Sequence, residues 1–285
     1  MSNTKNILLH THMYTKDKLL HPAMPPLDTV EFEQLRRAIQ IPDVRDIDYR
    51  DFKKEIENHF RNTTVNQLKG FDAFRQHDII LGCQNYIDNI ISKNGIDGVQ
   101  IFEHDYLYYQ KISPHIKYTT LESLIAKKPL LMAMPFPGHL GTHRQMEQII
   151  QVCNDKEIDL HLDCSWLTSA FDIKFDFDQP CIKSFAMSFS KAYALHWNKI
   201  GLRWSRSKDV TDTLSILNDS NAISKSNLYV ARKYMENFPI DHLVKKYKIK
   251  YFDACRELKL RPSNVIHACF SIDRKKLYGV KKLFD

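Results

Sequence analysis

The chain has 285 residues, of which 43% are apolar and 26% are charged, and its formal net charge is +7. This composition is that of an ordinary soluble globular protein and excludes an intrinsically disordered chain. The six cysteines form no C-x-x-C pair, which argues against a metal site and indicates reduced thiols in a cytoplasmic protein. Because no apolar run approaches membrane-spanning length and no signal-peptide core begins the chain, we expect no membrane partner.

Two amphipathic helices are predicted near the N-terminus, after an irregular arm over residues 1–28. Asp28 is a candidate cap for the first helix, Thr29–Gln40, whose apolar residues fall on one face. The second helix is predicted over Tyr49–Phe60 by the same spacing.

Short apolar strands then alternate with helices from residue 78 to residue 205. This order predicts an α/β fold with a mostly parallel central sheet, helices on both faces and a site at the strand ends. The predicted strands cover residues 78–81, 99–102, 129–134, 158–163 and 184–187, and the predicted helices between them cover residues 86–92 and 143–154.

The stretch K-S-F-A-M-S-F-S-K, Lys183–Lys191, ends one of these strands in a lysine. A charged ammonium is costly to bury, and burial lowers its pKa, so Lys191 is a candidate amine nucleophile that could form a Schiff base. The alternative is a surface lysine in a serine-rich turn.

The C-terminal part is predicted to be mostly helical, with helices over residues 211–221, 226–238 and 241–258 and a last strand over residues 264–271. Three regions follow from the whole pattern: an arm and helix (1–45), a large domain (46–205) and a helical, small α+β region (206–285).

S-F-S-K, followed eight residues later by K-I-G and preceded by Asp163 at a strand end, resembles the signature of fold-type I pyridoxal phosphate-dependent aminotransferases. The chain is similar to the aspartate aminotransferase-like class, with a shortened C-terminus. The resemblance implies that Lys191 carries pyridoxal phosphate as an internal aldimine and that Asp163 pairs with the pyridine nitrogen, which makes the ring an electron sink. It also implies an amino acid or similar amine as substrate and a homodimer.

Further residues are assigned by the same resemblance. Arg274 is the candidate for the substrate carboxylate, and Arg203 could assist the phosphate because Lys199 stands where the family has arginine. Tyr49 would reach the phosphate of the neighbouring subunit, and Tyr106 would stack on the ring; packing roles remain the alternative for both. The other implied cofactor contacts are Gly82, Cys83, Gln84, His139, Trp166, Ser188, Ser190 and Lys199.

Two other interpretations remain open besides an aminotransferase. The same machinery serves decarboxylases and lyases, and the substituted positions would also fit an aminotransferase-like binding or scaffold protein. The lysines of the C-terminal region could suggest a nucleic-acid ligand, but no nucleic-acid motif accompanies them, so we expect none.

Overall fold

A five-stranded mixed sheet forms the centre of the computed structural model, which describes residues 26–95, 97–274, 276–280 and 284. Within this sheet β6 is parallel to both of its neighbours, β5 and β8. Strand β9 is antiparallel to both of its neighbours, β8 and β2. Only β9 therefore runs against the other strands of this sheet, which confirms the predicted α/β class. In spatial order the strands are β2 (Gln76–Ile80), β9 (Gly201–Ser205), β8 (Ile182–Ser188), β6 (Leu160–Asp163) and β5 (Leu130–Ala133).

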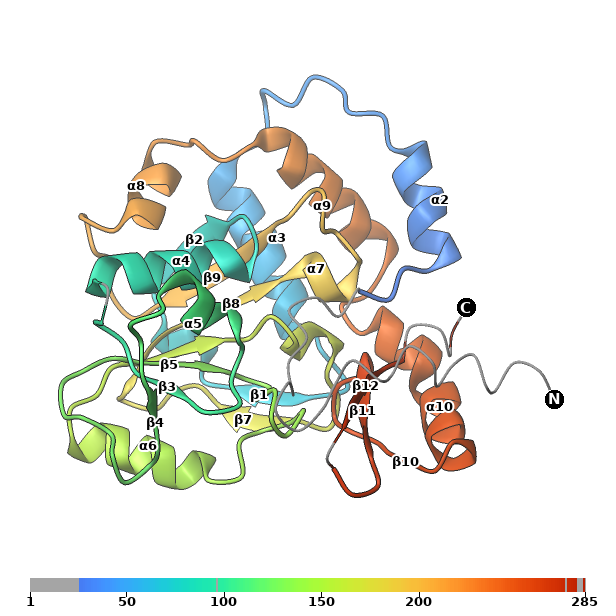
Figure 1. Cartoon of the computed structure of the whole chain (residues 1–285). Helices are drawn as coiled ribbons and strands as arrows, with labels where there is room; N and C mark the ends of the chain where they lie inside the picture. Colours follow the sequence, from blue (N-terminus) through green and yellow to red (C-terminus); the bar gives the residue numbers. More distant parts are fainter. Residues whose placement is uncertain (1–25, 96, 275, 281–283, 285) are drawn as a thin grey trace.

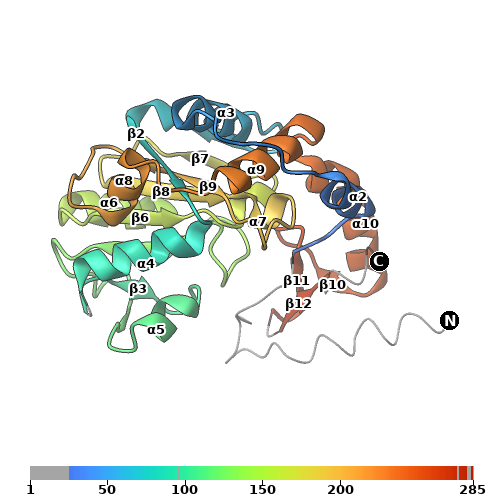
Figure 2. The same ribbon diagram turned by 90° about the horizontal axis from the view of Figure 1, so that it is seen from above.

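Helices cover both faces of this sheet (Figures 1 and 2). Helix α4 (Cys83–Asn94) contacts β2, β6 and β8 on one face, where α5 (Tyr108–Ile112) lies beside it. Helix α3 (Tyr49–Arg61) contacts β2 and β9 on the other face and packs against α9 (Lys225–Asn237). Helix α6 (Met146–Asp155) connects β5 to β6. No helix among the described residues is long and apolar enough to cross a membrane.

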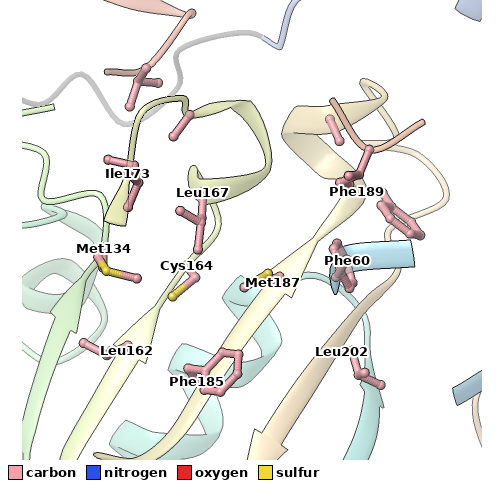
Figure 3. Packing of buried hydrophobic residues seen from close by; sticks show 14 of the residues in the cluster. Phe60, Met134, Leu162, Cys164, Leu167, Ile173, Phe185, Met187, Phe189 and Leu202 are labelled. Atoms are coloured by element: carbon pink, nitrogen blue, oxygen red, sulfur yellow. The ribbon is translucent and has the colours of Figure 1, made fainter. Parts of the chain in front are cut away.

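The alternation of side chains along β8 explains how one strand serves two apolar cores. Phe185 and Met187 belong to the larger apolar cluster, together with Phe60 of α3, whereas Ala186 belongs to the smaller cluster with Tyr86 of α4. Successive side chains of a strand point to opposite faces, so both faces of a central strand need to be apolar. Figure 3 shows part of the larger cluster, with Phe185 and Met187 on the same strand.

The two predicted N-terminal helices are confirmed, but the cap of the first one is a different residue from the one predicted. Asp48 caps α3 by accepting from the N–H groups of Arg50 and Asp51. The cap of α2 (Val30–Ala38) is Thr29, whose hydroxyl accepts from Phe32 N–H, and not the predicted Asp28. Asp28 instead forms an ion pair of 2.7 Å with Arg36, which lies in the last turn of the helix.

Two small parallel strand pairs flank the central sheet. One joins β1 (Gln67–Lys69) to β7 (Lys174–Asp176), and the other joins β3 (Ile101–Phe102) to β4 (Tyr118–Thr119). Short 3-10 turns, η2 (Phe71–Ala73) and η3 (Leu167–Ser169), and the one-turn helix α7 (Phe189–Ala192) lie between strands.

The C-terminal region contains the three predicted helices and a small antiparallel sheet. The helices are α8 (Thr213–Asp219), α9 and α10 (His242–Glu257), and the sheet joins β10 (Leu260–Arg261), β11 (Ala268–Ser271) and β12 (Leu277–Gly279). The predicted last strand is thus shorter than expected, and β12 follows it. Residues from all three predicted regions, such as Leu27, Phe185 and Val280, share one apolar cluster, and the region boundaries stay a prediction.

Arg203 is a structural residue rather than a reserve phosphate ligand. Its guanidinium is 4% exposed and forms ion pairs with Asp78 and, at 2.8 Å, with Asp212. It also donates to Asn89 Oδ1 at 3.2 Å and to Ser215 Oγ at 3.0 Å. Because all three guanidinium nitrogens already donate to these partners, the arginine is committed to joining β9, β2 and α8.

Replacing this arginine by methionine is expected to lower the free energy of unfolding by about 3–5 kcal/mol, because two buried carboxylates lose their cation. Urea denaturation followed by circular dichroism measures the change. Arg37→Met is the control, since the pair of Arg37 with Glu33 is largely exposed and is expected to contribute less than about 1 kcal/mol. Equal losses in the two variants would contradict the structural role of Arg203.

Candidate cofactor site

The candidate site lies where β6 and β8 end. Asp163 is the last residue of β6, and its parallel neighbour in β8 is Ala186. Strand β8 ends two residues later at Ser188, and α7 then carries Lys191. Because parallel strands end at the same edge of a sheet, the acid and the lysine come together there.

The amine of Lys191 is buried against Trp166, with Nζ 5.3 Å from the centre of the indole ring. Burial lowers the pKa of Lys191 to about 8, and the negative charge of Asp163 opposes this shift. A large fraction of the amine is therefore neutral near pH 8, as a nucleophile or a base requires. The structure thus brings together Lys191, Asp163 and Trp166, three residues chosen from the sequence.

Asp163 is 2% exposed and is held by directed donors. Tyr109 donates its hydroxyl to Oδ2 at 3.1 Å, and the Ser165 N–H donates to Oδ1 at 3.0 Å. Burial raises the pKa of Asp163, and these two donors counteract the shift. Tyr109, which was not among the predicted site residues, is thus the tyrosine that contacts the acid, and the predicted stacking of Tyr106 on a cofactor ring stays a prediction. Tyr106 packs edge-on against Tyr109, and burial and the charge of Asp163 raise its pKa to about 12.

Removing the hydroxyl of Tyr109 is expected to raise the pKa of Asp163 further, because the ionised carboxylate loses a donor. Carbon-13 NMR of labelled aspartate carboxyls measures this in Tyr109→Phe. In the control, Tyr108→Phe, the lost hydroxyl donates to Asp88 at 2.8 Å, and Asp163 should titrate as in the parent chain. A pKa of Asp163 that is unchanged in both variants would contradict the role of Tyr109.

The N-terminus of α4 meets Ser190 and Lys199 in a cradle suited to an anion. A methyl group on Gly82, the residue before α4, would lie 3.6 Å from both Ser190 Oγ and the Lys199 side chain. The φ angle of Gly82 is +82°, a value that favours glycine. Backbone N–H groups and the helix dipole favour a negative charge at this end of the helix, and Lys199 adds a cation.

The loop 189–200 that carries both lysines is closed by the pairing of Ser188 with Gly201. A methyl group on Gly201 would lie 2.2 Å from the carbonyl oxygen of Met187, so the close approach of β8 and β9 requires glycine here. This pairing fixes Lys191 on one side of the loop and Lys199 on the other.

The side chains of Cys83 and Gln84 are directed to other partners. Cys83 is buried, its thiol donates to Ala186 O at 3.5 Å, and burial raises its pKa. Its thiol also contacts Ser188 and Asp163. Gln84 donates to the hydroxyl of Tyr108 at 2.7 Å. The two residues can therefore serve a phosphate through their backbone N–H groups.

Two other predicted residues have their contacts elsewhere. The Tyr49 hydroxyl lies within hydrogen-bond distance of two carbonyl oxygens of its own chain, Asn221 O at 2.8 Å and Ile223 O at 2.5 Å, which favours the packing role. His139 contacts Phe136 and His143, and burial and nearby cations lower its pKa to about 4.

Arg274 lies in the turn between β11 and β12, at the tip of this hairpin. The opposite end of the hairpin holds His267, whose carbonyl oxygen accepts from Val280 N–H. His267 contacts Trp166, with 6.0 Å between the ring centres, and so approaches the site that Arg274 was expected to serve. No sequence signal singled out His267, which stands in an apolar run.

Similar solved structures give the fold. The chain matches aspartate aminotransferase from Thermus thermophilus with maleate at 13% identity and a TM-score of 0.60, over 86% of this chain and 74% of that one. It matches histidinol-phosphate aminotransferase from Sinorhizobium meliloti in complex with pyridoxal-5'-phosphate at 16% identity and a TM-score of 0.59, over 87% and 73%. It also matches L-threonine-O-3-phosphate decarboxylase from Porphyromonas gingivalis at 12% identity and a TM-score of 0.55, over 84% and 81%.

No protein-family model and no curated protein sequence matches the chain. At such low identities the structural similarity establishes the fold: this chain has the fold of the fold-type I pyridoxal phosphate-dependent aminotransferases.

Proposed function

We propose that the protein is a pyridoxal phosphate-dependent enzyme that acts on an amino acid or a similar amine, as an aminotransferase. The observation that carries this proposal is the buried amine of Lys191 beside Asp163 and Trp166, at the strand ends of this fold. A buried lysine with a pKa of about 8 and a carboxylate held by two donors has little structural purpose, and this combination supports a catalytic one.

The residues present fit the cofactor. Lys191 would hold it through Nζ, and the cradle of Gly82, Ser190 and Lys199 would hold its phosphate. Asp163 would face the pyridine nitrogen, and Trp166 offers an aromatic face to the same space. Pyridoxal phosphate supplies an electron sink for the pair released when a bond to the amine-bearing carbon breaks.

Lys191 and Asp163 divide the proton chemistry between them. Near pH 8 the amine of Lys191 can accept a proton at Nζ and return it, because both forms are populated at its pKa. The donors from Tyr109 and Ser165 keep Asp163 oriented and favour its ionised form, in which it can retain a proton on a ring nitrogen opposite it. Asp163 is 2% exposed, so little water reaches its carboxylate.

A binding or scaffold protein is the second candidate. It is favoured by the side chains of Cys83 and Gln84, which contact Ala186 and Tyr108 instead of the cradle, and by Lys199 in the place of an arginine. A lysine offers a phosphate one point charge instead of a two-pronged donor, so a weaker grip on the cofactor is expected.

An absorption scan with added pyridoxal phosphate separates the two candidates. The proposed enzyme should gain a visible band that is absent from the Lys191→Ala variant, whereas a scaffold protein should gain none. With a panel of amines, oxo-products without carbon dioxide release would identify an aminotransferase, and carbon dioxide release would identify a decarboxylase.

A homodimer is part of the proposal. Trp197, two residues before Lys199, is 81% exposed, and Leu81, next to Gly82, is 42% exposed, so apolar side chains flank the cradle. Burial of such side chains against a second copy would be favourable. Sedimentation of the protein and of Trp197→Glu tests this, and an unchanged monomer in both would reject it. The six thiols, all free and buried, support a reducing compartment such as the cytoplasm.

A further inference from the structure

His267 is a buried histidine beside the proposed cofactor site, and none of the cofactor contacts derived above uses it. Its side chain is 2% exposed, and its ring lies 6.0 Å from that of Trp166. The same indole lies 5.3 Å from Lys191 Nζ, so Trp166 touches both the histidine and the amine. His267 and the amine of Lys191 therefore share Trp166 as a neighbour, and the charge of Lys191 acts on the imidazole.

A single hydrogen bond fixes which nitrogen of His267 carries the proton. The backbone N–H of Leu27 donates to Nε2 at 3.2 Å. Because a backbone N–H can only donate, Nε2 accepts, and the neutral ring carries its proton on Nδ1. Burial and the charge of Lys191 lower the pKa of His267 well below its usual value, so the ring stays neutral at physiological pH.

The remaining donor, Nδ1–H, has no hydrogen-bond partner among the described residues, although it is buried. Buried donors in native proteins are almost always satisfied, and one that is not calls for a ligand or water. The two nitrogens thus differ: Nε2 is anchored to the chain segment before α2, whereas Nδ1, on a ring that contacts Trp166, keeps a donor without a partner among the described residues.

The Nδ1–H donor of His267 carries no charge, and this restricts which ligand groups it can bind. A carboxylate removed from water needs a cation, and arginine meets that need with two parallel hydrogen bonds. His267 offers one N–H without charge, and Arg274 lies at the far tip of the β11–β12 hairpin. A neutral oxygen, such as a hydroxyl, matches a single neutral donor without the cost of burying an unpaired charge.

We infer that His267 determines substrate specificity, donating from Nδ1 to a neutral oxygen of the substrate, and that the enzyme prefers amino alcohols to the corresponding α-amino acids. This inference rests on the proposed function, since it concerns the substrate of the same site. It narrows the amine substrate to one that carries a hydroxyl where an amino acid carries its carboxylate.

Alaninol and alanine make a matched pair, because they differ only in the group that His267 would meet. The parent protein, loaded with pyridoxal phosphate, should show a higher kcat/KM for alaninol. His267→Asn keeps a neutral donor near the position of Nδ1 and should retain the preference. His267→Leu, which has no donor, should lose at least about tenfold in the alaninol-to-alanine ratio. His267→Arg should shift the ratio toward alanine. Thermal melts show beforehand which variants fold.

Two measurements do not depend on turnover. In nitrogen-15 NMR of the protein without cofactor, His267 should show the Nδ1–H tautomer between pH 6 and 8, and in Leu27→Pro, which lacks the donating N–H, that signature should change. In the Lys191→Ala background, spectral titration of the loaded protein should give tighter binding of alaninol than of alanine, and His267→Leu should abolish the difference.

A parent protein that binds the cofactor but prefers alanine, or a ratio that is the same in His267→Leu, would overturn the inference and leave the proposed function intact. If pyridoxal phosphate does not bind at all, the proposed function fails and the inference fails with it. The NMR tautomer distinguishes a misplaced His267 from a wrong substrate class, since a protonated Nε2 alone would also overturn the inference.

Discussion

Lys191→Ala is expected to abolish covalent attachment of pyridoxal phosphate and to lower turnover by at least about 10³-fold. The variant loses both the holder of the cofactor and a positioned proton acceptor, and the latter alone contributes about 10²–10⁴-fold in enzymes. Borohydride reduction followed by peptide mass mapping should place the adduct of the parent protein on Lys191. Lys183→Ala is the control, because Lys183 lies on β8, the strand that leads to Lys191, but is 45% exposed and pairs with Asp159.

The pH dependence of attachment provides a second test of the same residue. With a pKa of about 8, the neutral fraction of Lys191 rises about tenfold per pH unit below pH 8 and levels off above it. The attachment rate should follow this curve. A rate that keeps rising to pH 10, or an adduct on a different lysine, would show that a surface amine is being modified instead.

Asp163→Asn is expected to leave the cofactor bound and to slow proton abstraction from the substrate by about 10²–10³-fold, the usual cost of removing one electrostatic partner in an active site. The amide is neutral, so it no longer favours a protonated ring nitrogen. Exchange of the substrate's α-hydrogen with deuterated water measures this step directly, without the rest of the turnover.

Asp105→Asn is the matched control for that variant. Asp105 is another buried carboxylate, 3% exposed, that accepts from Tyr106 N–H and Ala133 N–H, and burial raises its pKa well above the usual range. Asparagine should therefore replace it with little effect on exchange. Equal exchange rates for the parent, Asp105→Asn and Asp163→Asn would reduce Asp163 to a structural residue.

Local patterns in the sequence were sufficient for much of the fold. The predicted strands around residues 78–81, 129–134, 158–163 and 184–187 all appear in the central sheet, because an apolar run bounded by turn residues is a local signal. The same signal located Asp163 and Lys191, since a strand end can be identified without knowledge of the neighbouring strand.

What escaped prediction depends on contacts between distant segments. The reversal of β9 is set by its pairing with β8 and β2, and the role of Arg203 by two acids, 125 residues before it and 9 after it. Tyr109 was not among the predicted site residues, because only the packing of α5 brings its hydroxyl to Asp163. The tautomer of His267 is set by a hydrogen bond from Leu27, 240 residues away in the sequence.

Because Lys191 and Lys199 lie in the same closed loop, residues 189–200, we expect the two lysines to move together. The ends of this loop are joined by the Ser188–Gly201 pair, and Phe189 N–H donates to Ile200 O at 3.0 Å, so separation of the first β8–β9 pairs would release Lys191 and the cradle lysine together. Amide hydrogens at both ends of the loop should then exchange with solvent as one cooperative unit. Opening of this loop would therefore weaken phosphate binding by Lys199 and displace the amine of Lys191 at the same time, and closing would restore both.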